Sequence, residues 1–137
     1  MKKIILMLVL LGISNVAMAG WVKIGHVDAG ALYVDSRDTG QSTPNGWIVW
    51  EAIDYKKVQY VQGLPYHTLV FQEEYNCATR LDRARGFTMY SGHMMYSGRG
   101  AKGENVYSDP NGGTWSGWIP LPPGSIAYLI LKGLCNK

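Results

Sequence analysis

Hydrophobic and polar residues alternate through much of this chain, and the alternation predicts β-strands separated by turns. The clearest run covers residues 67–85. Leu69, Phe71, Tyr75 and Cys77 share one parity, which Glu73 interrupts. The other parity carries polar residues: Thr68, Gln72, Glu74 and Asn76. A period of two is expected of an antiparallel strand with one buried face. A strand of this length should not stay straight, so we expect a bend near Ala78.

Further strands are predicted at residues 21–24, 31–35, 47–55 and 87–96. In the segment 47–55, one face carries Ile48, Trp50 and Ala52, and the other carries Val49, Glu51 and Ile53. Segments rich in proline, asparagine and glycine separate the strands and predict turns or loops at 43–46, 63–65, 98–103 and 109–113. The 9 tyrosines, 5 tryptophans and 17 glycines also favour many short strands joined by tight turns.

The pattern changes after the prolines at positions 120, 122 and 123. Ser125 can cap a helix, and apolar or small residues then recur at helical spacing: Ile126, Leu129, Ile130, Gly133 and Leu134. We therefore expect a C-terminal helix of two to three turns that ends at Cys135.

The first nineteen residues have the features of an export signal. Lys2 and Lys3 precede an apolar run from Ile4 to Ile13, and Ala17-Met18-Ala19 places small residues before the expected cleavage site. We expect residues 1–19 to be removed, leaving a single domain at 20–137 that begins with Gly20 and is periplasmic or secreted. The expected cleavage site has no cysteine for a lipid anchor, and no second apolar segment is long enough to span a membrane.

Removal of Lys2 and Lys3 would lower the formal charge from +3 to +1. The remaining basic residues are scattered, which argues against a nucleic-acid partner. Cys77 and Cys135 are the only cysteines, an even number in a chain expected to be exported, and we predict a disulfide that ties the helix to the sheet. A reactive or metal-binding pair is the alternative, but neither a Cys-x-x-Cys motif nor a histidine at ligand spacing accompanies them.

Other motifs have a structural interpretation beside a chemical one. Residues 98–103 match G-x-G-x-x-G, but Pro110 leaves little room for the helix that a dinucleotide site requires, so we expect a hairpin loop whose Arg99 and Lys102 could touch an acidic partner. Carboxylates and arginines gather between positions 73 and 85, where we favour a solvated strand face with cross-strand ion pairs over a catalytic site: Glu73, Glu74, Arg80, Asp82, Arg83 and Arg85.

Aromatic residues and histidines leave two further alternatives open. Trp47 and Trp50 could line a sugar-binding groove, although tryptophans more often fill the core of a small β domain. The histidines, His26, His67 and His93, could serve a small secreted hydrolase if one lay beside a nucleophile and a carboxylate. No motif supports that chemistry, so we expect no catalytic residues, no metal and no cofactor, and the binding residues stay unassigned.

The order of several short motifs resembles the surface-adhesin protein E family of Gram-negative bacteria over essentially the whole chain after residue 19. The motifs are Trp21, Tyr33-Val34-Asp35, Val49-Trp50, Asp54-Tyr55, Glu74-Tyr75-Asn76-Cys77 with Arg80, Trp115 or Trp118, Pro123-Gly124-Ser125 and Cys135. The resemblance implies a small α+β domain, in which a helix packs on an antiparallel sheet and the Cys77–Cys135 bond links them.

The resemblance also implies binding rather than catalysis. The founding member is a surface lipoprotein that attaches to host matrix and serum proteins such as laminin and vitronectin. We therefore expect an exported, adhesin-like protein with a protein partner. A periplasmic accessory or inhibitor-like protein with a bacterial partner is the alternative, because a fold does not determine function and the anchor cysteine of the founding member has no counterpart here. The oligomeric state is not indicated.

Overall fold

The computed structural model describes residues 20–36, 40–94, 100–109 and 113–136. The predicted signal at 1–19 and most of the predicted turn at 109–113 lie outside these residues. The described residues form eight strands and one helix: β1 (Trp21–Val27), β2 (Gly30–Asp35), β3 (Gln41–Thr43), β4 (Gly46–Val61), β5 (Leu64–Asn76), β6 (Leu81–Tyr90), β7 (Asn105–Ser108), β8 (Ile119–Pro120) and α2 (Ile126–Cys135).

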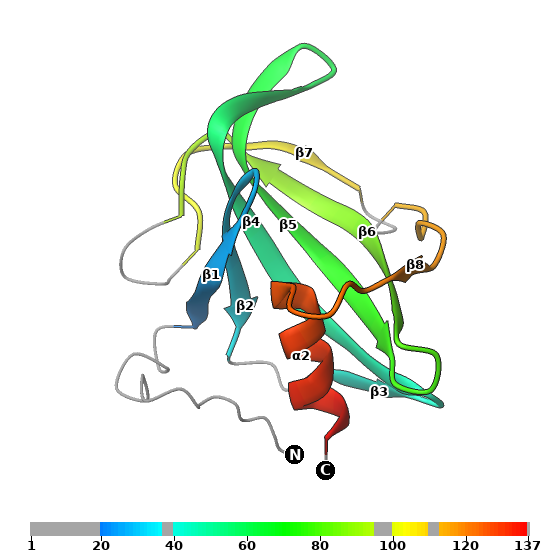
Figure 1. Cartoon of the computed structure of the whole chain (residues 1–137). Coiled ribbons are helices and arrows are strands. Elements are labelled where there is room, and N and C mark those ends of the chain that lie inside the picture. The colour runs from blue at the N-terminus through cyan, green and yellow to red at the C-terminus, as the bar shows by residue number, and fades with distance from the viewer. Residues whose placement is uncertain (1–19, 37–39, 95–99, 110–112, 137) are drawn as a thin grey trace.

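The strands form one antiparallel sheet in the order β1-β2-β4-β5-β6-β7. The short strands β3 and β8 pair with β4 and β6 respectively. Figure 1 shows the sheet curling around α2, which lies against one face. The predicted α+β fold, with a helix on an antiparallel sheet, is confirmed.

The long strands β4 and β5 form the centre of the sheet, and their register defines its two faces. Trp47 lies opposite Tyr75 and Trp50 lies opposite Gln72, so alternate residues point to opposite sides. We call the side with Val49 and Tyr75 the helix face, because Leu131 of α2 packs against both residues. The side with Trp50 and Ala52 is called the outer face. This division of β4 is the one that the sequence predicts.

The C-terminal helix begins and ends as its sequence predicts. The Ser125 hydroxyl accepts a hydrogen bond from the Tyr128 backbone nitrogen at 3.1 Å, and Ser125 has extended backbone angles. This is the geometry of an N-cap. Figure 1 shows α2 in front of β4 and β5. None of the helices in the described ranges has the length and apolarity needed to cross a membrane.

Replacement of Ser125 by alanine should destabilise the protein by about 1 kcal/mol, because the Tyr128 amide would lose its partner at the helix N-terminus. Chemical denaturation of Ser125→Ala and wild type measures the difference. Ser42→Ala provides a matched control outside the helix, because Ser42 is an exposed serine on β3. A helical signal and an unfolding midpoint that stay unchanged in Ser125→Ala would contradict the assigned cap.

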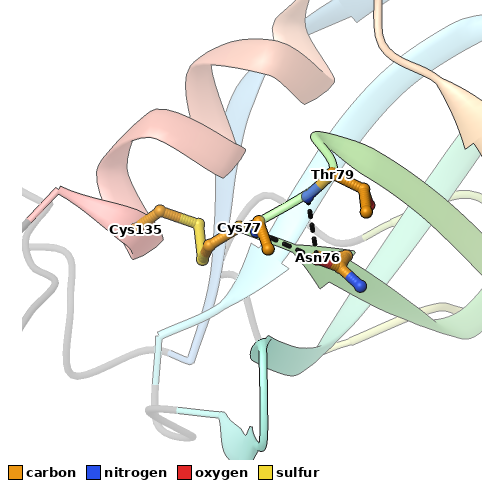
Figure 2. The surroundings of a disulfide bond; sticks show 5 residues. Asn76, Cys77, Thr79 and Cys135 are labelled. Carbon is orange, nitrogen blue, oxygen red and sulfur yellow. Dashed lines mark hydrogen bonds between the residues drawn. A yellow bond between two sulfur atoms is a disulfide. The ribbon is translucent and has the colours of Figure 1, made fainter.

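The predicted disulfide is present between Cys77 and Cys135, whose Cα atoms are 5.6 Å apart. Figure 2 shows that the bond joins the last helical residue to the segment that follows β5. A hydrogen bond also joins α2 to the segment between β5 and β6, because Arg80 Nη1 donates to the Tyr128 hydroxyl at 2.9 Å. The helix is therefore attached covalently and by hydrogen bonding to one end of the sheet.

The predicted strand 67–85 is wrong in one respect: the chain reverses rather than bends at Ala78. β5 ends at Asn76, whose Oδ1 accepts backbone hydrogen bonds from Ala78 at 2.9 Å and Thr79 at 3.0 Å (Figure 2). Arg80 then adopts a φ of 61° before β6 begins at Leu81. The side chain of Asn76 thus builds a turn without glycine or proline.

The outer face of the sheet is more covered than the alternation predicts. Thr68 lies at an expected polar position but is fully buried, and its hydroxyl donates to the Gly92 carbonyl at 2.8 Å. Ala52, Trp21 and Met94 form a small apolar cluster on this side. The chain after β6 therefore folds back over part of the outer face, which local alternation could not indicate.

Several strand boundaries also differ from the predictions. β4 continues to Val61 instead of ending at residue 55. Of the predicted strand 87–96, residues 87–90 belong to β6, which ends at Tyr90, and residues 95 and 96 lie outside the described residues. Three short strands, β3, β7 and β8, are not predicted, and β8 includes Pro120. They are edge segments of two to four residues whose pairing depends on longer neighbours.

Candidate functional site

The most prominent exposed feature is the end of the β4–β5 hairpin, which we call the arm and define as residues 56–67. β2 pairs with β4 only as far as Tyr55, and β6 pairs with β5 only as far as Thr68. The Lys56 backbone nitrogen still donates to the Ala29 carbonyl at 3.0 Å. Further out, the two strands pair with each other through Gln59–Tyr66 to Val61–Leu64. Figure 1 shows this two-stranded ribbon projecting past the rest of the sheet.

The sequence specifies the arm locally through its turn and its base. Gln62 and Gly63 both have positive φ, 51° and 80°, in a two-residue turn of the kind that matches strand twist. At the base, the rings of Tyr55 and Tyr66 meet edge to face at 6.0 Å. Burial raises the pKa of both phenols above the usual value, so both remain neutral at physiological pH. The predicted break at 63–65 corresponds to this turn.

Large apolar side chains are exposed along the arm. The exposed fractions are 39% for Val58, 65% for Tyr60 and 47% for Leu64. Lys56 and Lys57 are also exposed, and residues 55–66 contain no acidic residue. Exposed aromatic and aliphatic groups beside exposed positive charge are typical of protein-binding surfaces. Sequence reasoning missed this surface, although the alternation of Val58, Tyr60 and their polar neighbours could have extended the strand.

A second aromatic feature lies on the outer face at β6. The Arg85 guanidinium carbon lies 4.5 Å from the Trp115 ring centre and 5.1 Å from the Phe87 ring centre. Arg83 lies 4.8 Å from Trp115 and 4.4 Å from Trp118. Alternating cations and rings attract each other. We call these five residues, Arg83, Arg85, Phe87, Trp115 and Trp118, the ladder. The ladder holds residues 115–118 against β6.

Polar neighbours fix the two arginines of this ladder. Arg83 forms an ion pair with Glu74 at 2.8 Å, and Arg85 donates from Nε and Nη2 to Gln72 Oε1 at 3.1 and 2.9 Å. The cross-strand ion pair predicted for this region is therefore present. The ladder therefore has a structural role. Trp118 is 39% exposed, and the residue that follows it, Ile119, is 55% exposed.

The carboxylates of the helix face contradict the prediction of a solvated charged strand. Glu73 and Asp82 are each 8% exposed, and Glu51 is 2% exposed. The Tyr75 hydroxyl donates to Glu51 Oε2, and Tyr75 lies opposite Asp82 across β5 and β6. Sequence reasoning assigned Glu73 and Asp82 to solvent because local alternation does not reveal that α2 and the sheet curvature cover them.

Burial raises the pKa values of the Glu51 and Asp82 carboxyl groups, and it keeps Glu51 mostly neutral at physiological pH. Burial raises the pKa of Glu51 to about 8, and repulsion from Asp82 adds to the effect. Burial likewise raises the pKa of Asp82 to about 6. The Tyr75 pKa rises well above its usual value because of burial and the neighbouring Glu51. These groups are enclosed beneath the helix, so they have the environment of a structural network rather than an accessible catalytic pair.

Two of the three histidines lie together, and His26 lies apart on β1. His93 Nδ1 donates to Asp54 Oδ1 at 2.5 Å, which supplies the histidine–carboxylate part of the hydrolase alternative. The nearby Ser91 hydroxyl instead accepts from the Glu104 backbone nitrogen at 2.8 Å. No serine hydroxyl is bonded to a histidine among the described side chains, so the nucleophile–base contact required for this chemistry is missing there.

The G-x-G-x-x-G segment has no helix after it. Positions 98 and 99 lie outside the described residues, whereas Gly100 to Gly103 lead into strand β7 at Asn105. Ala101 forms a β-bridge with Met94, and Lys102 is exposed. This arrangement matches the predicted hairpin loop and lacks the helix N-terminus on which dinucleotide phosphates rest. Trp50, meanwhile, packs against Phe87 at 4.5 Å, as expected for a core aromatic.

The fold and the exposed arm define a small disulfide-linked α+β domain suited to contact with another protein. The family model of surface-adhesin protein E matches residues 21–136, and the chain therefore belongs to this family. Membership places it among adhesin-like surface proteins and points away from catalysis. No curated protein matches the sequence.

Proposed function

We propose that this chain is an exported adhesin-like protein that uses its β4–β5 arm to bind a host matrix or serum protein. The exposure of Val58, Tyr60 and Leu64 on an uncovered hairpin is the observation that carries the proposal. Family membership supports adhesion as the type of activity. Laminin and vitronectin are the first partners to test, because the founding member of the family binds proteins of this kind.

Export is part of the proposal. Residues 1–19 would direct the chain out of the cytosol and be removed before Gly20. The disulfide between Cys77 and Cys135 supports this location, because structural disulfides persist in oxidising compartments and are rare in the cytosol.

The physical basis for binding is the removal of the arm from water. A buried tyrosine or leucine at the centre of an interface commonly contributes more than 1 kcal/mol, whereas surrounding contacts contribute little. Lys56 and Lys57 lie beside these apolar groups without an acidic residue in the arm. An acidic patch on the partner would therefore increase the association rate and fix the orientation of binding.

Binding of the oxidised protein to immobilised laminin and vitronectin should weaken at least tenfold in Tyr60→Ala and in Leu64→Ala. Leu129→Ala is the matched control for Leu64→Ala, since Leu129 is 59% exposed on the helix, away from the arm. Surface plasmon resonance measures the three variants beside wild type. The control should retain wild-type affinity.

Two results would count against the proposed function. Absence of saturable binding to matrix and serum proteins would exclude adhesion to the host. Equal losses of affinity in all three variants would show that the arm is not the binding surface. Cell fractionation distinguishes the alternative of a periplasmic protein: retention entirely inside the outer membrane would exclude a host partner and direct the binding test to periplasmic proteins.

A further inference from the structure

His67 and His93 form a close pair at the junction of the arm and the sheet. Their ring centres are 4.1 Å apart and the ring planes are tilted by 40°. Pairing of Thr68 with Tyr90 brings the two segments together, and the Thr68 hydroxyl bond to the Gly92 carbonyl holds the chain that carries His93. Strand pairing and this hydrogen bond therefore place the two histidines beside each other.

One nitrogen of each imidazole is already engaged. His67 Nδ1 lies 3.1 Å from the Ser91 carbonyl oxygen, and because a carbonyl can only accept, this nitrogen carries a hydrogen. His93 Nδ1 donates to the Asp54 carboxylate at 2.5 Å. A neutral imidazole has one N–H and one lone pair. The lone pair of each ring is consequently on Nε2, on the side of the ring away from its anchor.

This pattern is typical of histidines that bind metal ions, which donate their other ring N–H to a carboxylate or a backbone carbonyl. Asp54 is itself fixed, because its second oxygen accepts from the Met94 backbone nitrogen at 3.1 Å and its side chain is only 15% exposed. The His93 side chain is 52% exposed, so an ion can reach the pair from solvent. Two imidazole nitrogens about 2.0–2.1 Å from one ion place the ring centres about 4.5–5 Å apart, so binding requires the two rings to separate by about half an ångström to one ångström from their present 4.1 Å.

We infer that His67 and His93 form a surface site for a late first-row divalent metal ion, bound through the two Nε2 atoms. Imidazole nitrogen suits Cu²⁺, Ni²⁺ and Zn²⁺, and Cu²⁺ should bind most tightly of the three. No group of three or more potential ligands occurs within the described parts of the chain, so water completes the coordination. Asp54 acts as a positioning residue. His67 is the last residue of the arm, but the inferred metal site does not rest on the proposed adhesion.

Titration of the oxidised protein with Cu²⁺ tests the site by calorimetry and by electron paramagnetic resonance. Wild type should bind one ion with nitrogen ligation visible in the spectrum. His67→Asn and His93→Asn should each weaken binding at least tenfold and remove one nitrogen from the spectrum. Asp54→Asn should weaken binding about tenfold while both nitrogens remain, because it changes the orientation and basicity of the His93 ring.

His26→Asn is the matched control, since it removes the third histidine on a different strand and should leave affinity and spectrum unchanged. A thermal melt of each variant without metal verifies that it is folded. The inferred site is wrong if wild type binds no Cu²⁺ saturably, if only one of the two histidines affects binding, or if His26→Asn reduces affinity as much as the paired variants do.

Discussion

Cys135→Ser should lower the free energy of unfolding by about 4 kcal/mol and the melting temperature by about 15 °C. The two cysteines are 58 positions apart, so loss of the bond releases a long loop in the unfolded chain and increases its conformational entropy. A loss of this size approaches the whole net stability of many small domains. Differential scanning calorimetry of oxidised wild type and of the variant measures it.

Reductant provides the internal control for this experiment. It should lower the melting temperature of wild type towards that of Cys135→Ser and leave the variant unchanged. Cys77→Ser should match Cys135→Ser, and the double variant should be no less stable than either single variant. Equal melting temperatures for oxidised wild type and Cys135→Ser would show that the bond does not stabilise the fold.

Stability should also decrease as pH rises from about 5 to 8, and Glu51→Gln should remove much of this decrease. The folded state keeps a proton on Glu51, whose pKa is raised by burial from 4.5 to about 8, while the unfolded chain releases it. A folded state that binds the extra proton is favoured at low pH. The contribution is therefore present near pH 4.5 and is lost as pH rises towards 8.

The expected slope from Glu51 is at most about 1.4 kcal/mol per pH unit. Burial also raises the pKa of Asp82 from 3.8 to about 6, which adds a decrease in the same direction over the lower part of the range. Glu51→Gln keeps an oxygen that can accept from the Tyr75 hydroxyl but has no proton to lose. The variant should be near wild-type stability at pH 5 and more stable than wild type at pH 8.

Urea denaturation at half-unit intervals of pH measures both slopes. Glu74→Gln is the matched control, because Glu74 is a glutamate on the neighbouring strand that faces Arg83 on the outer side of the sheet. Its slope should follow wild type. Parallel stability curves for wild type and Glu51→Gln would contradict a buried, protonated Glu51.

Most of the fold could be predicted where local chemistry decides it. Alternation along residues 47–55 placed Val49 and Trp50 on opposite faces, and the structure keeps that division. Ser125 caps α2 as predicted because hydroxyl capping involves only neighbouring residues. The reversal at Asn76 could not be distinguished from a bend, since its turn contains no glycine or proline and depends on a side-chain hydrogen bond.

The candidate surfaces were less predictable, because each combines residues that pairing brings together. His67 and His93 share no motif, and their contact follows only from the β5–β6 register. Recognising the arm depends on knowing where strand pairing ends: β2 pairs with β4 only as far as Tyr55, and β6 pairs with β5 only as far as Thr68. A strand pattern reports which side chains alternate, but it does not report what covers them.

Local spacing and residue count were enough to predict the β-rich composition, the C-terminal helix and the only possible cysteine pair. Tertiary structure alone decided that Glu51 is buried beside Tyr75, that the Tyr60 side chain stays in water and that two distant imidazoles meet. The physical reason is that burial and long-range contact depend on strand register and on the placement of the helix, which no local window of the chain contains.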